Sequence, residues 1–327
     1  MKPLIIALTS IGLTVCAVLV VATLFVYFIV LEAPSDFPEE TYLEIPQGST
    51  LSSVSDALAE SNIINSSFFF KVGAYVKGTQ DQIKSGNYYF DEPARTDVVL
   101  SRIINGYYNI PAERVTIVEG QASYQYVPVI AAGLPFVQES ELLKLITSQK
   151  KEGYLYPDTY FFPENSTPEQ VIQIMEENFK KKIAPLALEI QNSSYTQDEI
   201  ITMASLIENE AGNASYETKR KVAGVLWNRV QIGMPIQADA VFPFILKKYL
   251  PRVLFSHLEI NSPYNIYKNV GLPPGPIGSP SIESIRAAVN PAETDNLFYL
   301  TGFDGNFYYS KTNEGHEQNR RKYLNYN

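Results

Sequence analysis

The chain has 327 residues, 45% of them hydrophobic, with a formal net charge of −9 and a pI near 4.9. This length allows two domains of ordinary size, and the composition excludes a disordered chain. Nucleic-acid affinity comes mostly from Lys and Arg that neutralise phosphates, so the acidic balance argues against a nucleic-acid partner. One Cys and two His cannot form an intrachain disulfide or a four-ligand Cys/His zinc site.

Residues 4–31 carry no charged side chain, and about 20 apolar residues suffice to cross a bilayer as a helix. The apolar run continues through Tyr27 and Phe28 without the small-residue cleavage site of a signal peptide. We therefore predict an uncleaved transmembrane helix. Lys2 in the tail of residues 1–3 and the acidic residues after position 31 place the amino terminus in the cytoplasm, so the remainder is extracytoplasmic.

An acidic linker over residues 32–41 leads into a region, 42–150, that we expect to be a small mixed α+β unit with connecting elements. Apolar and polar residues alternate over 42–45, a turn follows at Gly48, and apolar residues recur at helical spacing from Leu51. This order of strand, turn and helix resembles a LysM-like module, which binds the amino-sugar chains of cell walls. A purely structural domain fits the pattern equally well.

The third segment, residues 151–327, contains a helix with two glutamates near its end. A capping box of Thr196 and Glu199 marks where the helix begins. Glu208 and Glu210 fall on opposite borders of its apolar stripe. A carboxyl held against an apolar surface has a raised pKa and can act as a general acid. Ion pairs with the basic residues 219–221 would instead make both glutamates structural, and spacing does not choose between them.

Three runs carry a family resemblance: TMASLIENEAGN at 202–213, KRKVAGVLWNRVQIGMPIQADAVFPF at 219–244, and SPYNIYKNVGLPPGPIGSPSIESIRAAVNPA at 262–292. In this order and spacing they resemble the endolytic murein transglycosylases of the YceG/MltG-like family. The resemblance covers nearly all of the chain beyond the apolar segment. It implies an α+β protein with a transmembrane helix, a small LysM-like domain and a larger α+β catalytic domain at 151–327, in the inner membrane of a bacterial cell.

The resemblance also implies the catalytic residue and the reaction. The second glutamate of the E-x-E pair is catalytic in the family, which corresponds to Glu210, and Glu208 becomes a neighbour that tunes or orients it. The implied reaction cleaves the β-1,4 bond between N-acetylmuramic acid and N-acetylglucosamine within peptidoglycan and leaves a 1,6-anhydro end. This implied reaction trims or terminates nascent glycan and needs no metal or organic cofactor. The resemblance also suggests cell-wall synthases as partners.

Further substrate-binding or supporting residues come from the later motifs of the resemblance. Amide, carboxylate, aromatic and imidazole side chains suit the hydroxyl and acetamido groups and ring faces of sugars. These residues are Gln237 and Asp239 of a Q-x-D segment, Tyr264, Asn265 and Tyr267 of a Y-N-x-Y segment, and His316. Turn formation is the alternative role for the Q-x-D pair, and a structural role is the alternative for His316.

Two other functions remain open from the sequence. A non-catalytic wall-binding scaffold for cell-wall synthases would use the E-x-E helix only as structure. A hydrolytic muramidase would need a second carboxylate, Asp239 or Glu208, and would leave reducing ends.

Overall fold

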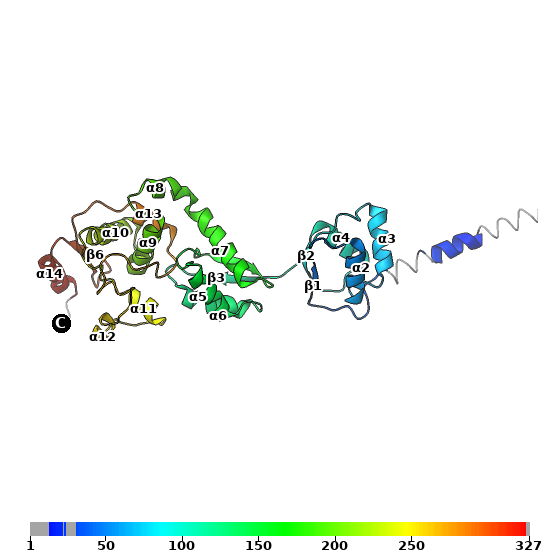
Figure 1. Ribbon diagram of the computed structural model, residues 1–327, viewed down its shortest axis with the longest axis horizontal. Coiled ribbons are helices and arrows are strands. Elements are labelled where there is room, and N and C mark those ends of the chain that lie inside the picture. The colour runs from blue at the N-terminus through cyan, green and yellow to red at the C-terminus, as the bar shows by residue number, and fades with distance from the viewer. Residues whose placement is uncertain (1–12, 22, 24–30, 325–327) are drawn as a thin grey trace, which may run out of the picture. The chain divides into compact units, whose positions relative to one another are not determined.

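The computed structural model describes residues 13–21, 23 and 31–324. The chain forms two compact units, Met1–Pro111 and Ala112–Asn327 (Figure 1). Most of the apolar segment predicted to cross the membrane, residues 4–31, lies outside the described residues. Within the described ranges, we find no helix of the length and apolar character that a membrane span requires.

Helices and small two-stranded antiparallel sheets build both units. In the N-terminal unit, β1 (Thr41–Ile45) pairs with β2 (Gly86–Phe90), and α2 (Leu51–Glu60) and α3 (Ser67–Lys77) lie between them in the chain. Helix α4 (Thr96–Asn105) completes the unit. The strand and helix expected after the linker are therefore confirmed. The order of two helices between two paired strands is compatible with a LysM-like module, whose identity stays a prediction.

The second unit begins with a subdomain built on β3 (Ala112–Thr116) and β4 (Thr159–Pro163), which pair antiparallel. Helices α5 (Ser123–Gly133), α6 (Glu139–Ser148) and α7 (Pro168–Ile183) surround these strands. Their side chains share one hydrophobic core, with Tyr126, Leu142, Phe162 and Met175 at its centre. The chain from residue 112 to 150 thus belongs to the second unit, whereas the sequence grouped it with the N-terminal region. The reason is that the partner of β3 lies beyond residue 150.

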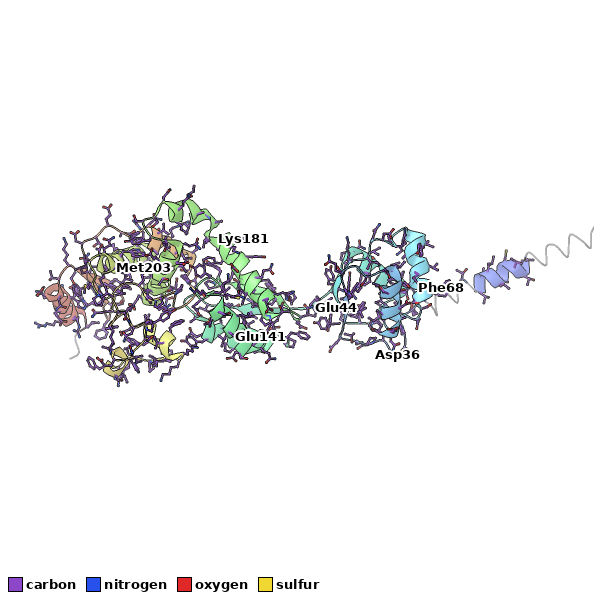
Figure 2. The ribbon with its side chains drawn as sticks, viewed as in Figure 1. Asp36, Glu44, Phe68, Glu141, Lys181 and Met203 are labelled. Atoms are coloured by element: carbon purple, nitrogen blue, oxygen red, sulfur yellow. The ribbon has the colours of Figure 1, made fainter. Side chains whose placement is uncertain are left out.

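The core of the second unit consists of α9 (Gln197–Ala211), α10 (Tyr216–Gln231) and α13 (Ile282–Val289). All side chains from 200 to 208 in α9 are buried, and Met203 lies in this core (Figure 2). The indole of Trp227 in α10 donates a hydrogen bond of 3.0 Å to the carbonyl of Ala288 in α13. Helix α13 packs against both α9 and α10, and α9 carries both glutamates near its end.

Shorter elements complete the second unit. The 3-10 helix η2 (Ala184–Leu186) and α8 (Ala187–Asn192) precede α9, and two short helices follow α10: α11 (Val241–Leu246) and α12 (Phe255–Leu258). At the C-terminus, β5 (Phe298–Thr301) and β6 (Phe307–Ser310) form a hairpin, followed by α14 (Asn313–Tyr323). This mixture of helices and small sheets confirms the α+β class.

Candidate active site

Helix α9 carries both candidate glutamates, and its capping box forms as predicted. The hydroxyl of Thr196 accepts a hydrogen bond of 3.3 Å from the backbone N–H of Glu199, and the Glu199 carboxylate accepts one of 2.8 Å from the backbone N–H of Thr196. The helix ends at Ala211, so Glu208 and Glu210 both lie in its last turn.

The surroundings of Glu208 are those of a structural residue. Its carboxylate is buried and accepts hydrogen bonds from the backbone N–H of Ser281, at 2.9 Å, and from the Ser281 hydroxyl. The ammonium of buried Lys219 lies 3.8 Å from the same carboxylate oxygen. Ser281 is the N-cap of α13, so Glu208 joins α9, α10 and α13. The ion-pair alternative is therefore correct for Glu208.

Glu210 is half-buried and has different surroundings. Its Oε2 accepts a hydrogen bond of 2.9 Å from the hydroxyl of Tyr299 in β5. Burial raises the pKa of Glu210 above its usual value, the Tyr299 hydrogen bond and Arg229 act to lower it, and the charge of Asp239 raises it further. Because the effects that raise the pKa are the larger ones, the Glu210 carboxyl keeps its proton to a higher pH than an exposed glutamate does. That is the property a general acid needs.

Asp239 and Tyr267 come together beside Glu210. The Tyr267 hydroxyl donates a hydrogen bond of 2.5 Å to Oδ1 of Asp239. Burial and the Asp239 carboxylate raise the pKa of Tyr267, so the phenol remains protonated. Gln237 has a left-handed backbone (φ 54°), and its N–H donates to the carbonyl of Ile266 at 3.1 Å. This backbone bond connects the loop of Gln237 and Asp239 to the loop of Tyr267.

Two cavities meet at Glu210, which lines both. The larger, about 690 Å³, extends from the end of α9 towards Glu119, Tyr124 and Tyr249. The smaller, about 380 Å³, has a wall of polar and aromatic side chains: Arg229, Gln237, Asp239, Tyr267, Phe298, Tyr299, Asn313 and His316. A chain of sugars that occupied both cavities would place a bond in its interior, rather than its end, at the Glu210 carboxyl.

His316 lies in the wall of the smaller cavity, far in sequence from Glu210. Its ring stacks on Phe298, with centroids 5.4 Å apart. Burial lowers its pKa, which keeps the imidazole neutral. Its Nδ1 is buried and has no hydrogen-bond partner within the described part of the chain. The structure therefore brings Gln237, Asp239, Tyr267 and His316 into one wall with Glu210.

The other two predicted residues of the Y-N-x-Y segment lie elsewhere. Asn265 is fully buried, and its amide donates to the carbonyls of Leu258 and Ile260 at 2.9 and 2.8 Å. Its Oδ1 accepts from the backbone N–H of Tyr267 at 3.1 Å. Asn265 thus supports the loop that presents Tyr267, and it has no amide group free for a sugar.

Tyr264 packs on a separate part of the second unit. Its ring lies 4.9 Å from that of Phe244 and lines a cavity of about 870 Å³ between α7 and α9. Neither cavity that contains Glu210 includes Tyr264 in its lining.

Three residues of the site could not be predicted from the sequence. Tyr299 and Arg229 act to lower the pKa of Glu210, and Glu119 lines the larger cavity. Partial burial and the charge of Glu208 raise the pKa of Glu119. Tyr299 lies 89 positions from Glu210, so helical spacing could not reveal their hydrogen bond. Within the described residues, no cluster of three or more His, Cys, Asp or Glu side chains could hold a metal ion.

Comparisons with known proteins identify the family. Residues 43–322 match the YceG-like family. The chain belongs to this family. It is 30% identical over 307 residues to the "Endolytic murein transglycosylase" of Bacillus subtilis, a match that covers 86% of this chain and 84% of that protein. A protein of the same name from Streptococcus pneumoniae strain D39 is 28% identical over 89% of this chain, which spans 60% of that longer protein.

A solved structure shows a similar fold. The crystal structure of a YceG-like protein from Listeria monocytogenes superposes with a TM-score of 0.58 at 31% identity. The match covers 86% of this chain and 99% of the Listeria chain.

Proposed function

We propose that the chain is a membrane-anchored endolytic lytic transglycosylase that cleaves the β-1,4 bond between N-acetylmuramic acid and N-acetylglucosamine in peptidoglycan. The names of the Bacillus and Streptococcus relatives support the enzyme class and the substrate. The observation that carries the residue assignment is Glu210, a half-buried carboxyl with a raised pKa at the junction of two cavities.

Glu210 performs both proton transfers of this reaction. Its protonated carboxyl gives a proton to the glycosidic oxygen as the bond to the muramoyl anomeric carbon breaks, and that carbon becomes oxocarbenium-like. The carboxylate then accepts the proton of the muramoyl C6 hydroxyl, whose oxygen attacks the anomeric carbon. The products are a 1,6-anhydromuramoyl end and a free N-acetylglucosamine hydroxyl, and Glu210 regains its proton.

The nucleophile is tethered to the reacting ring, so the protein need not position a water molecule. Tyr299 supports the second half of the reaction. Its hydroxyl stabilises the Glu210 carboxylate that forms when the proton leaves. The Tyr267–Asp239 pair and His316 offer polar groups to the sugar in the smaller cavity.

The hydrolytic alternative requires a second carboxylate near the anomeric carbon. Glu208 is poorly suited to this role because Ser281 and Lys219 occupy its buried carboxylate. Asp239 is exposed and shares the smaller cavity with Glu210. It is therefore the residue through which a muramidase would act, and the products distinguish the two reactions.

The remaining parts of the proposal concern location. Residues 4–31 anchor the chain as a single-pass helix in the cell (inner) membrane. The amino terminus lies in the cytoplasm, and the chain from residue 32 onward lies on the other side of the membrane. The N-terminal unit contacts wall glycan as a LysM-like module. Trimming or termination of nascent strands beside cell-wall synthases suits an anchored enzyme of this kind.

The test is to incubate the full chain in detergent with purified peptidoglycan and to analyse the products by mass spectrometry. Anhydromuramoyl ends that disappear in Glu210→Gln but persist in the Tyr264→Phe control support the proposal. Reducing ends in place of anhydro ends would favour the muramidase. Products that survive in Glu210→Gln would reject the assigned residue, and a folded, wall-binding but inactive wild type would favour the scaffold.

A further inference from the structure

Helix α3 of the N-terminal unit exposes apolar side chains along one side, here called the outer face of α3. The residues that form it are Phe68, Val72, Tyr75 and Val76, which are 63%, 39%, 66% and 81% exposed. Their spacing of four, three and one residues places them together on one side of the helix. On the opposite side, Phe70 and Ala74 are fully buried in the core. The outer face is therefore an apolar surface that the unit itself leaves uncovered.

The chain enters the N-terminal unit at one end of this helix. The carbonyl of Leu31, the last residue of the apolar segment, accepts a hydrogen bond of 2.8 Å from the N–H of Thr96. The next carbonyl, of Glu32, accepts one of 2.9 Å from the Asn65 side chain. Asn65 directly precedes Ser66, the N-cap of α3. These bonds hold the end of the apolar segment beside the first turn of α3, where Phe68 lies (Figure 2).

We infer that the outer face of α3 docks onto the surface of the lipid bilayer beside the point where the chain leaves it. The inference rests on the proposed anchor at residues 4–31 and goes beyond the proposed reaction. A tether fixed at the first turn of α3 keeps the helix within reach of the bilayer at all times. The outer face offers the kind of aromatic and aliphatic side chains that interfacial helices bury at the boundary between headgroups and acyl chains.

Apolar insertion, and not charge, drives this docking. Residues 32–111 contain eleven Asp and Glu residues against five Lys and Arg, so anionic lipid does not attract the unit. Lys71 of α3 lies 3.6 Å from the Asp56 carboxylate, whose negative charge opposes the attraction of Lys71 to an anionic headgroup. A bilayer of zwitterionic phosphatidylcholine is therefore a sufficient partner, and the docking withstands salt.

The test uses the full chain, reconstituted in phosphatidylcholine liposomes, with an environment-sensitive NBD fluorophore on one cysteine. Cys16→Ser removes the native cysteine, and Phe68→Cys or Tyr107→Cys provides the labelling site. Tyr107 is a matched control because it is 57% exposed and lies in the same unit. Thr96, which contacts Leu31, begins α4, whereas Tyr107 follows the C-terminal end of that helix. Flotation confirms that each labelled chain is in the liposomes.

We expect the label at position 68 to show blue-shifted emission and to be quenched by doxyl-labelled lipid, in high salt as well as low. The label at 107 should show neither effect. The triple substitution Val72→Asp, Tyr75→Asp and Val76→Asp should abolish quenching at 68 without loss of flotation.

Three results would overturn the inference. An unquenched label at 68 in floated liposomes would assign the outer face to another partner, and equal quenching at 68 and 107 would show non-specific contact. A chain that does not float would refute the anchor and the docking together, while the activity measured in detergent would still stand or fall by itself.

Discussion

The two ends of the E-x-E motif show how two residues of the same type on one helix turn acquire different chemistry. The Glu208 carboxylate is surrounded by the groups that stabilise a buried charge: two Ser281 donors and the Lys219 ammonium. The Glu210 carboxyl faces a cavity, one phenol and the negative charge of Asp239. The first arrangement holds three helices together, and the second keeps a proton available. The role of each glutamate therefore follows from the partners that distant segments supply and not from its position on the helix.

The largest effect is expected from Glu210→Gln, which keeps the shape and removes the acid. General acid–base catalysis contributes about 10²–10⁴-fold, and with both transfers assigned to one residue we expect a loss of about 10³-fold in kcat. The folded state holds the Glu210 proton more tightly than the unfolded state, so ionisation costs stability as pH rises above the unfolded pKa. The variant should therefore be at least as stable as the wild type at neutral pH. Product formation and thermal melting measure the two effects.

Glu208→Ala should show the reverse pattern. Removing one partner of a buried ion pair leaves an uncompensated charge and costs about 3–5 kcal/mol of stability. Here the uncompensated charge is that of Lys219. A second contact of Lys219, with the exposed Glu283 at 3.7 Å, reduces the loss. Denaturant unfolding measures this loss. The double variant Glu208→Leu, Lys219→Met replaces both charges by apolar side chains, and it should recover much of the stability that Glu208→Ala loses. If Glu208→Ala melted like the wild type, the structural role assigned to Glu208 would be wrong.

Tyr299→Phe should change the pH dependence of the reaction. The Tyr299 hydrogen bond lowers the pKa of Glu210, so its removal raises that pKa, and the alkaline limb of the kcat profile should move to higher pH. We also expect a decrease in kcat of about tenfold, because a hydrogen bond to a charged group contributes about 1.5–3 kcal/mol. A profile whose alkaline limb stays in place would contradict the contact with Glu210.

Asp239→Asn should give the smallest effect and a shift of opposite sign. The charge of Asp239 raises the pKa of Glu210, so its removal should move the alkaline limb to lower pH. Activity near the optimum should fall only a few-fold, and the products should remain anhydromuramoyl ends. Complete loss of activity would instead identify Asp239 as an essential second carboxylate, as the hydrolytic alternative requires.

Local chemistry could be predicted from the sequence. The capping box of Thr196 and the apolar spacing located α9 and placed both glutamates near its end. The strand at residues 42–45 and the helix from Leu51 followed from alternation and turn residues in the same way. Each of these features depends on residues a few positions apart.

Features that depend on distant partners could not be predicted. Ser281 and Tyr299 lie 73 and 89 positions from the glutamates they contact, and helical spacing contains no information about them. From the sequence, the Y-N-x-Y motif around Asn265 is predicted to contact sugar. The Asn265 amide instead donates hydrogen bonds to backbone carbonyls, and Tyr267 is the one residue of this motif that lines a cavity with Glu210. The boundary after Pro111 could not be predicted because the partner of β3 is β4, and two helices separate these strands in the sequence.

The protonation of Glu210 can be measured directly. An infrared titration of the protein labelled with ¹³C-glutamate, taken as the difference between wild type and Glu210→Gln, isolates this single carboxyl. We predict a pKa above the usual glutamate value, which falls in Asp239→Asn and rises in Tyr299→Phe. A pKa at or below the usual value, unchanged by either substitution, would show that these surroundings do not hold the proton on Glu210.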